Sequence, residues 1–279
     1  MRALILIFSI IFFLSSCNPK KKTEEKSTAE TAVQKQVFSY NLNSFNEKYV
    51  LPEKLTEISG LSYSNNGQLF CVNDEQGKIF VYSITDKDII KTIDFGKDGD
   101  YEGIEIVGNT VYVLNSDGRI KAIDLSTEKT INIDCSQKEV LEYEGLAYDQ
   151  DKNSLLLAVK EMKGSKRIYE YNLSSESMKV RYIIPDTFID ANSDKKEFKP
   201  SGIAVHPISK EIYILASAGK KLMVISTENE KVNQYNLDNQ LFAQPEGICF
   251  SPNGELFISS EGKGGSGYIL RFDGIQTNL

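Results

Sequence analysis

The chain has 279 residues and a formal net charge of −7, because 39 acidic residues outnumber 32 lysines and arginines. This acidic balance argues against nucleic acid as a partner and against adsorption to an anionic membrane surface. The sequence has one histidine, His206, with no serine or cysteine placed beside it as a nucleophile, which excludes a catalytic triad.

The N-terminal segment is typical of a bacterial lipoprotein signal, which we predict over residues 1–16. A charged start precedes an apolar run from Ala3 to Leu14 that is too short to span a membrane as a helix. The sequence Leu14-Ser15-Ser16-Cys17 resembles the lipobox, whose cysteine becomes the lipidated first residue of the mature protein. We therefore expect a membrane anchor through lipid on Cys17, and a lipid-anchored protein in the bacterial cell envelope, facing the periplasm or exposed at the surface.

Residues 17–37 are predicted to hold the lipidated cysteine and a disordered tether. Asn18 to Gln36 are mainly Lys, Glu, Thr, Ser and Ala, and offer no apolar face to bury. The folded domain is predicted over residues 38–279. Near its start, Lys48-Tyr49-Val50-Leu51 has the composition of a single β-strand.

A short phrase then recurs five times, with a glycine at its centre. Successive glycines are separated by 43, 42, 57 and 45 residues, a period that indicates an array of small supersecondary units. The five copies are Ser59-Gly60-Leu61, Glu102-Gly103-Ile104, Glu144-Gly145-Leu146, Ser201-Gly202-Ile203 and Glu246-Gly247-Ile248.

Each copy opens four predicted strands separated by Asn-, Gly- or Pro-containing turns, which is typical of a propeller blade. The fifth unit ends after its third strand, Tyr268 to Phe272, and Lys48 to Leu51 can supply the missing outer strand. We therefore predict an all-β fold: a five-bladed β-propeller of four-stranded antiparallel blades, closed by an N-terminal strand. An open β-solenoid or a two-sheet sandwich would not explain the missing strand at one end and the spare strand at the other.

The strands also place the remaining cysteines and the longest insertion. Cys71, Cys135 and Cys249 all fall on predicted strands, and their odd number favours buried free thiols, with a Cys71–Cys249 bridge as the alternative.

The longest insertion, Pro185 to Lys199, links blades three and four. It lands on the face where inner strands begin, whereas the opposite face receives plain hairpin turns, among which His206 is predicted to be a turn residue.

Carboxylates gather where the inner strands begin and the second strands end, because these positions share one face of an antiparallel blade. We call this face the acidic mouth and expect function there. Its predicted members are Glu57, Glu102, Glu144 and Glu246 from strand starts, Asp74, Glu75, Asp117, Lys160, Glu161 and Glu261 from strand ends, and Asp186, Asp190, Asp194 and Glu197 from the insertion.

Carboxylates about 6 Å apart repel by roughly 3 kcal/mol per pair at an effective dielectric constant near 20. Three or four around one axis therefore need compensation: some bind protons, or Lys160 and another base neutralise them, or a cation occupies the centre. An all-oxygen set suits Ca²⁺, and the alternative is a solvated acidic rim without an ion.

The assembled motifs resemble the SdiA-regulated family of bacterial envelope proteins, over about residues 48–273. The motifs are Leu55 to Leu61, Asn73 to Gly77, Tyr101 to Ile104, Glu142 to Leu146, Lys160-Glu161, Pro200 to Ile203 and Pro245 to Gly247. The resemblance implies a five-bladed propeller distantly related to NHL-repeat proteins. It also implies a calcium site on Glu102, Glu144 and Glu246, with Glu57 and Glu161 nearby. Blade four departs from the family pattern, since Lys199 and Ser217-Ala218 stand where Asp residues are usual.

Three functions compete at this stage. The first is a non-catalytic, calcium-binding envelope lipoprotein, monomeric, whose acidic mouth binds an unknown small molecule or protein. The alternative is a calcium-dependent hydrolase of a lactone or phosphate ester, in which Glu161 is the tentative candidate for the general base. The third is a structural protein-interaction disc in which the metal plays no part.

Overall fold

The computed structural model describes residues 36–64, 66–184, 198–226 and 232–278. The predicted signal peptide, Cys17, nearly all of the tether and most of the predicted insertion, including its four acidic residues, lie outside these ranges. Residues 35–279 form one compact unit.

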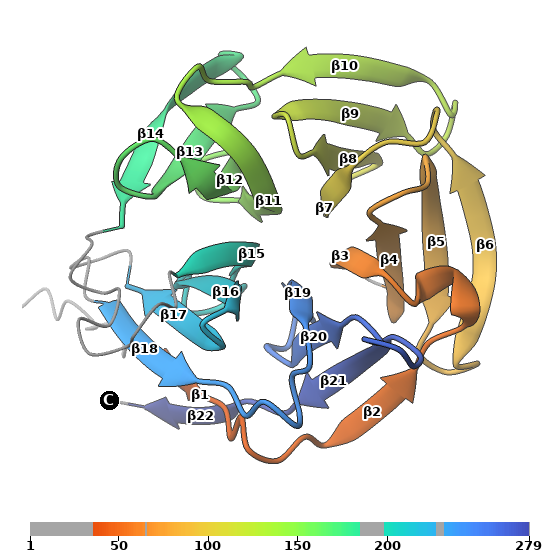
Figure 1. The fold of residues 1–279 in the computed structure, drawn as a ribbon, viewed down its shortest axis with the longest axis vertical. Helices are drawn as coiled ribbons and strands as arrows, with labels where there is room; N and C mark the ends of the chain where they lie inside the picture. Colours follow the sequence, from red (N-terminus) through yellow and green to blue (C-terminus); the bar gives the residue numbers. More distant parts are fainter. Residues whose placement is uncertain (1–35, 65, 185–197, 227–231, 279) are drawn as a thin grey trace, which may run out of the picture. The chain divides into compact units, whose positions relative to one another are not determined.

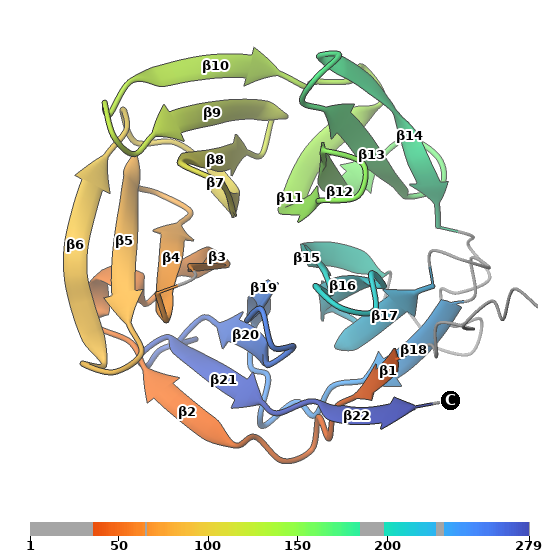
Figure 2. The ribbon, with the colours of Figure 1, turned by 180° about the vertical axis from the view of Figure 1, so that it is seen from behind.

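Five four-stranded antiparallel sheets surround one axis, as predicted (Figures 1 and 2). Blade one contains β3 (Ile58–Ser64), β4 (Gln68–Asn73), β5 (Lys78–Ser83) and β6 (Asp88–Asp94). Blade two contains β7 (Tyr101–Val107), β8 (Thr110–Asn115), β9 (Arg119–Asp124) and β10 (Thr130–Asp134). Blade three contains β11 (Val140–Asp149), β12 (Ser154–Met162), β13 (Arg167–Asn172) and β14 (Ser177–Ile183). Blade four contains β15 (Lys199–Val205), β16 (Ile212–Ala218), β17 (Lys221–Ile225) and β18 (Val232–Asn236).

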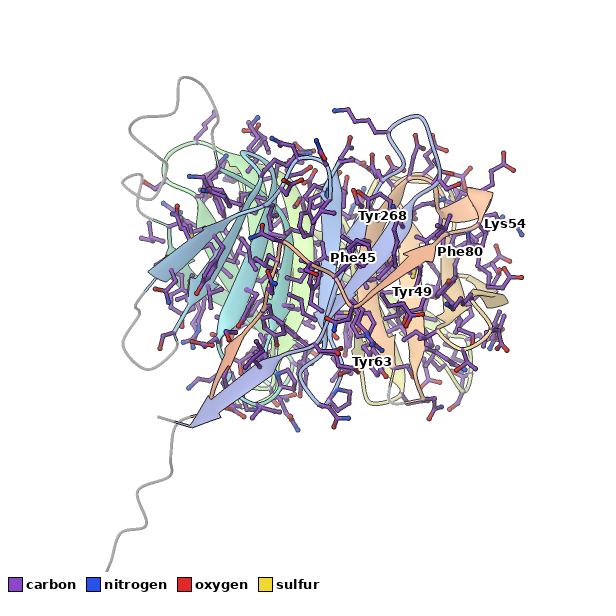
Figure 3. The ribbon with its side chains drawn as sticks, turned by 90° about the horizontal axis from the view of Figure 1, so that it is seen from below. Phe45, Tyr49, Lys54, Tyr63, Phe80 and Tyr268 are labelled. Atoms are coloured by element: carbon purple, nitrogen blue, oxygen red, sulfur yellow. The ribbon has the colours of Figure 1, made fainter. Side chains whose placement is uncertain are left out.

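Blade five is completed by the N-terminal strand. It contains β19 (Pro245–Phe250), β20 (Leu256–Ser260), β21 (Tyr268–Phe272) and β2 (Glu47–Val50). β2 pairs with β21 from Glu47↔Arg271 to Val50↔Tyr268, which confirms the predicted closure. The Tyr49 ring, labelled in Figure 3, is buried. It meets Tyr82 of blade one edge-on, with 6.3 Å between ring centroids, so the closing strand also joins blade five to blade one.

The chain ends form a pairing that the repeat pattern did not predict. β22 (Ile275–Asn278) pairs antiparallel with β1 (Gln36–Ser39) as a separate two-stranded sheet, so strand structure continues past Phe272. A short 3-10 helix, η1 (Glu53–Leu55), leads from β2 into β3.

The hydrophobic core lies between adjacent blades, because each sheet buries a face against its neighbour. In one such layer, Phe70 and Val72 of β4 share a buried cluster with Tyr101 and Val111 of blade two. Cys71 and Cys249 are buried and free, as predicted. Cys135 is also a buried free thiol, but it follows β10 instead of lying within a strand, which corrects the prediction.

The innermost strands approach so closely that only glycine fits at the repeated position. A Cβ on Gly103 would lie 2.9 Å from the Leu146 backbone nitrogen, and one on Gly202 would lie 2.4 Å from the Glu246 carbonyl oxygen. The glycine waist, as we call this ring, consists of Gly60, Gly103, Gly145, Gly202 and Gly247. The axial space that remains there is about 10 Å³, close to the size of one water.

Candidate metal-binding mouth

The residue before each repeated glycine is displaced from its strand pairing. In β7 the register passes from Tyr101↔Asn115 directly to Gly103↔Leu114, which leaves Glu102 without a cross-strand partner. Such a bulge bends the strand and re-aims the side chain. A register shift with one extra residue on the inner strand also occurs at Ser59, Glu144 and Ser201, and in blade five it spans Glu246 and Gly247.

Two kinds of residue occupy this bulge position. In blade one, Ser59 Oγ donates to the Tyr101 carbonyl oxygen at 2.6 Å, and in blade four Ser201 Oγ donates to that of Pro245 at 2.8 Å. Each serine thereby fastens its blade to the next. The other three blades carry glutamate at this position, so they present a carboxylate at the start of the inner strand.

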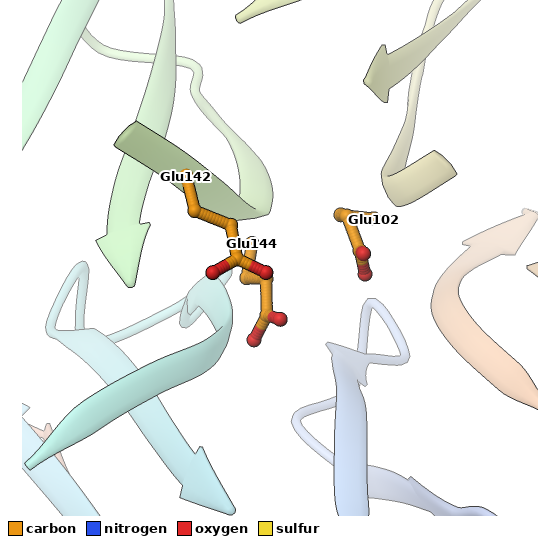
Figure 4. A group of neighbouring side chains, drawn as sticks. All are labelled: Glu102, Glu142 and Glu144. Atoms are coloured by element: carbon orange, nitrogen blue, oxygen red, sulfur yellow. The ribbon is translucent and has the colours of Figure 1, made fainter. Parts of the chain in front are cut away.

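Three carboxylates converge from β7 and β11 (Figure 4). Oxygens of Glu102, Glu142 and Glu144 lie within 4.8 Å of one another. The Lys160 ammonium donates to Glu144 and, at 2.9 Å, to Glu142, so Lys160 neutralises part of the cluster. Its neutralising role was one of the sequence-based alternatives.

The pKa values show that this compensation is incomplete. Burial, then the neighbouring Glu144 and a hydrogen bond with Asp100, raises the pKa of Glu102 to about 9. Burial raises the pKa of Glu144 to about 7, although Lys160 opposes this. Glu246 has its pKa raised well above its usual range by burial, then by Glu144 and Glu261. The folded protein therefore favours protons, or another source of positive charge, at these oxygens.

The rim beside this cluster is also acidic. Burial, then Asp74 and Glu57, raises the pKa of Glu261 to about 7. Asp74 has a raised pKa through burial and its neighbours Glu57 and Glu75, and its Oδ1 is buried without a hydrogen-bond partner. Glu57 and Glu75 themselves are exposed.

Two predicted members lie in local ion pairs instead of the carboxylate cluster. Exposed Asp117 accepts hydrogen bonds from the side chain and backbone of Arg119. Glu161 pairs with Lys199 and, at 3.5 Å, with Lys166, and these contacts hold the pKa of Glu161 below its usual range. The metal and base roles predicted for Glu161 therefore gain no support from its placement.

Glu142 and Asp100 belong to the mouth but were not among the predicted site residues. Both lie three residues before the repeated glycine, the same offset as Glu57, so alignment of the repeats at that offset could have found them. Blades four and five carry Lys199 and Gln244 there. On the blade-four side, Ser217 donates a hydrogen bond to Glu246 where the family pattern would place an acid.

The fold and the mouth define a five-bladed β-propeller with a buried carboxylate cluster where its inner strands begin. The family model described as SdiA-regulated matches residues 32–263. The chain therefore belongs to the SdiA-regulated family, as the motifs predicted.

Solved structures of three differently named proteins have a similar fold. An aldose sugar dehydrogenase from Streptomyces coelicolor, in its PQQ-bound form, is 12% identical with a TM-score of 0.57, over 86% of this chain and 99% of that chain. A chain of a nidogen/laminin complex is 12% identical with a TM-score of 0.53, over 73% of this chain and 72% of that one. A streptogramin B lyase is 14% identical with a TM-score of 0.50, over 87% and 73%. At these identities the likeness shows the fold alone.

Within the described residues, no helix has the length and apolar character needed to cross a membrane.

Proposed function

We propose that this protein is a calcium-binding β-propeller of the bacterial cell envelope, anchored through lipid on Cys17, whose acidic mouth binds a ligand or partner. The observation that carries the calcium assignment is the cluster of Glu102, Glu142 and Glu144, whose negative charge Lys160 compensates only in part.

The donor set fits a hard cation. Glu102 and Glu144 from the bulges, with Glu142 beside them, offer carboxylate oxygens of the kind that Ca²⁺ prefers. Glu246 adds a further buried carboxylate from blade five, electrostatically coupled to Glu144. The ion would supply the positive charge that the raised pKa values call for, and would join three blades at the axis.

A binding role is favoured over hydrolysis because the predicted base is engaged elsewhere. The ion pairs of Glu161 with Lys199 and Lys166 lower the pKa of its carboxyl group. A carboxylate with a lowered pKa is a weaker base than one without such partners. We therefore propose that the metal shapes and charges the mouth as a binding surface.

The test uses the chain from residue 18 onward, which omits the proposed lipidated Cys17, in wild-type form and as the Glu102→Gln/Glu144→Gln variant. Metal analysis should find about one calcium per wild-type chain and none in the variant. Calcium at about a hundred times its Kd should stabilise the wild type by about 2.7 kcal/mol, and EDTA should reverse this. Asp117→Asn is the matched control, since it also removes a carboxylate but leaves the cluster intact. Equal melting temperatures of the wild type in EDTA and in calcium would refute the calcium proposal.

Anchoring is tested separately in cells. Full-length wild type should sediment with membranes and incorporate labelled fatty acid, whereas Cys17→Ser should do neither. Incorporation that survives this substitution would place the lipid on another residue.

A further inference from the structure

A cavity lies at the end of the axis opposite to the acidic mouth, where the inner strands finish. It has a volume of about 380 Å³, within the range typical of small-molecule sites. Its wall includes Ser62, Glu105, Tyr148, His206 and Phe250, from all five blades' inner strands or the turns that follow them. In the side view of Figure 3, Tyr63, which also lines this cavity, lies toward the face opposite to Lys54. We call it the far cavity.

The far cavity is separate from the acidic mouth. Between them lies the glycine waist, where the axial space is only about 10 Å³, close to the size of one water. A ligand of the far cavity would therefore enter from the opposite face, and its binding would not require the calcium site proposed above.

Glu105 places one acidic group in the wall of the far cavity and fixes its position. Its Oε1 accepts hydrogen bonds from Ser62 Oγ at 2.9 Å and from the Ile106 backbone N–H at 3.0 Å, and the backbone of Tyr148 also donates to the carboxylate. These donors come from three adjacent inner strands, β3, β7 and β11. The carboxylate is thus held in one orientation before any ligand arrives.

The positive groups near the far cavity do not compensate Glu105. Lys210 pairs with Asp151 at 3.5 Å. His206 accepts backbone N–H bonds at Nδ1 from Ile208 and Ser209, and burial lowers its pKa to about 4, so its ring is neutral at physiological pH. Among the described residues, no lysine or arginine forms an ion pair with Glu105.

Aromatic side chains complete the wall. Tyr63, Tyr148 and Phe250 are only partly buried and line the same space as Glu105. Aromatic rings attract cations through their faces and also cover apolar ligand surface. A carboxylate without a counter-ion beside such rings is the combination that recognises an organic cation.

We propose that the far cavity binds a small organic molecule carrying a protonated amine, with its ammonium against Glu105 and its apolar body against Tyr63, Tyr148 and Phe250. The ammonium would supply the missing counter-ion, while the cavity volume sets the ligand at the size of a small metabolite and not of a peptide.

The direct test compares three probes of one shape and different charge: 2-phenylethylamine, 2-phenylethanol and phenylacetate. Binding is measured by calorimetry or protein NMR on the same chain from residue 18 onward, with calcium and with EDTA. The amine should bind at least about tenfold more tightly than the alcohol, because only the amine can form a desolvated ion pair with Glu105. The anion should not bind, because the Glu105 carboxylate repels it. No saturable binding of the amine at millimolar concentration, or equal binding of all three probes, would overturn the proposal.

Two variants assign the binding to this cavity. Glu105→Gln should weaken the amine at least about tenfold and leave the alcohol unchanged, whereas Glu128→Gln, in an exposed turn, should change neither. Val107→Phe reduces the cavity volume while keeping Glu105, and should weaken amine and alcohol alike. A folded Glu105→Gln protein that binds the amine as tightly as the wild type would place the site elsewhere. If Glu105→Gln does not fold, unchanged binding by Val107→Phe gives the same refutation.

A pH series adds a readout that a purely structural role of Glu105 would not produce. Burial raises the pKa of Glu105 to about 7, so amine affinity should increase between about pH 6 and about pH 8 as the carboxyl group ionises. The other titratable groups lining the cavity are Tyr63, Tyr148, His206, Lys210 and Cys249. The neutral alcohol should show no such change, and an amine affinity that is flat across this range would contradict the pairing with Glu105.

Discussion

Replacement of Lys160 by methionine should destabilise the calcium-free protein and also tighten calcium binding. The Lys160 ammonium lies against Glu144 and Glu142, and only 7% of the Glu144 side chain is exposed. In the calcium-free state this lysine is therefore the counter-ion of a buried carboxylate. A calcium ion on the same carboxylates would compete with it, so removal of Lys160 removes a competitor.

The size of the destabilisation follows from burial. Removal of one partner from a buried ion pair costs about 3–5 kcal/mol. Lys160 is 30% exposed, and the carboxyl groups left behind can take up a proton, so we expect about 2–3 kcal/mol at pH 8.

The loss should depend on pH in a defined direction. The pKa of Glu144 is raised from 4.5 to about 7, so the folded state favours the protonated form. The stability from this preference is fully present below about pH 4.5 and is lost as the pH rises through about 7. Without Lys160 the pKa of Glu144 rises further. The difference between variant and wild type should thus be small at about pH 5 and largest at about pH 8.

Denaturant unfolding in EDTA at the two pH values measures the stability difference, and calorimetry measures calcium affinity. Lys163→Met is the matched control, because Lys163 is exposed and lies three residues away. A stability loss of the same size at both pH values would refute the role of Lys160 as a counter-ion. Weaker calcium binding by Lys160→Met would show instead that this lysine supports the metal site.

The remaining predictions concern the glycine waist and the ring closure. Gly202→Ala should lower the unfolding free energy by about 1–3 kcal/mol, because the new Cβ would lie 2.4 Å from the Glu246 carbonyl oxygen. Gly96→Ala is the control, since the nearest contact of its Cβ is a flexible lysine side chain at 3.5 Å. In the same denaturant titration this control should lose far less stability. Tyr49→Ala should lower the unfolding free energy by about 3–5 kcal/mol, which thermal unfolding would detect. It should also expose the β21 edge to intermolecular pairing, which light scattering would detect. A Gly96→Ala loss equal to that of Gly202→Ala, or a stable monomeric Tyr49→Ala protein, would contradict these accounts.

The repeat pattern was sufficient to predict the blades because each blade carries the same glycine and turn signals at a regular spacing. It also predicted the closure by β2, since the fifth unit lacks one strand. The β1–β22 pair escaped prediction because it occurs once and joins residues at opposite ends of the chain, such as Ser39 and Ile275. Periodicity carries no information about such a pairing.

The site was predictable where it follows the repeat and not where it depends on contacts between blades. Glu102 and Glu144, which immediately precede their glycines, lie close together in the structure, and their role in metal binding stays a prediction. The pairing of Glu161 with Lys199 was not predictable, because Lys199 belongs to the next blade and the repeat does not specify which side chains meet across a blade boundary.

The far cavity lies on the face of the predicted hairpin turns, and its origin lies in how the repeats differ. Two residues after the repeated glycine, four blades carry small side chains, namely Ser62, Ala147, Ala204 and Cys249. Blade two alone carries a long charged one, Glu105, at this position. Small residues leave axial space, and the single exception places an acid in that space. His206 begins a turn, as predicted, and is also fully buried, with Nε2 hydrogen-bonded to Tyr40 at 2.9 Å. In this propeller the repeated glycines build the ring, and Glu105, which departs from its equivalents in the other blades, marks the cavity for which we propose a ligand.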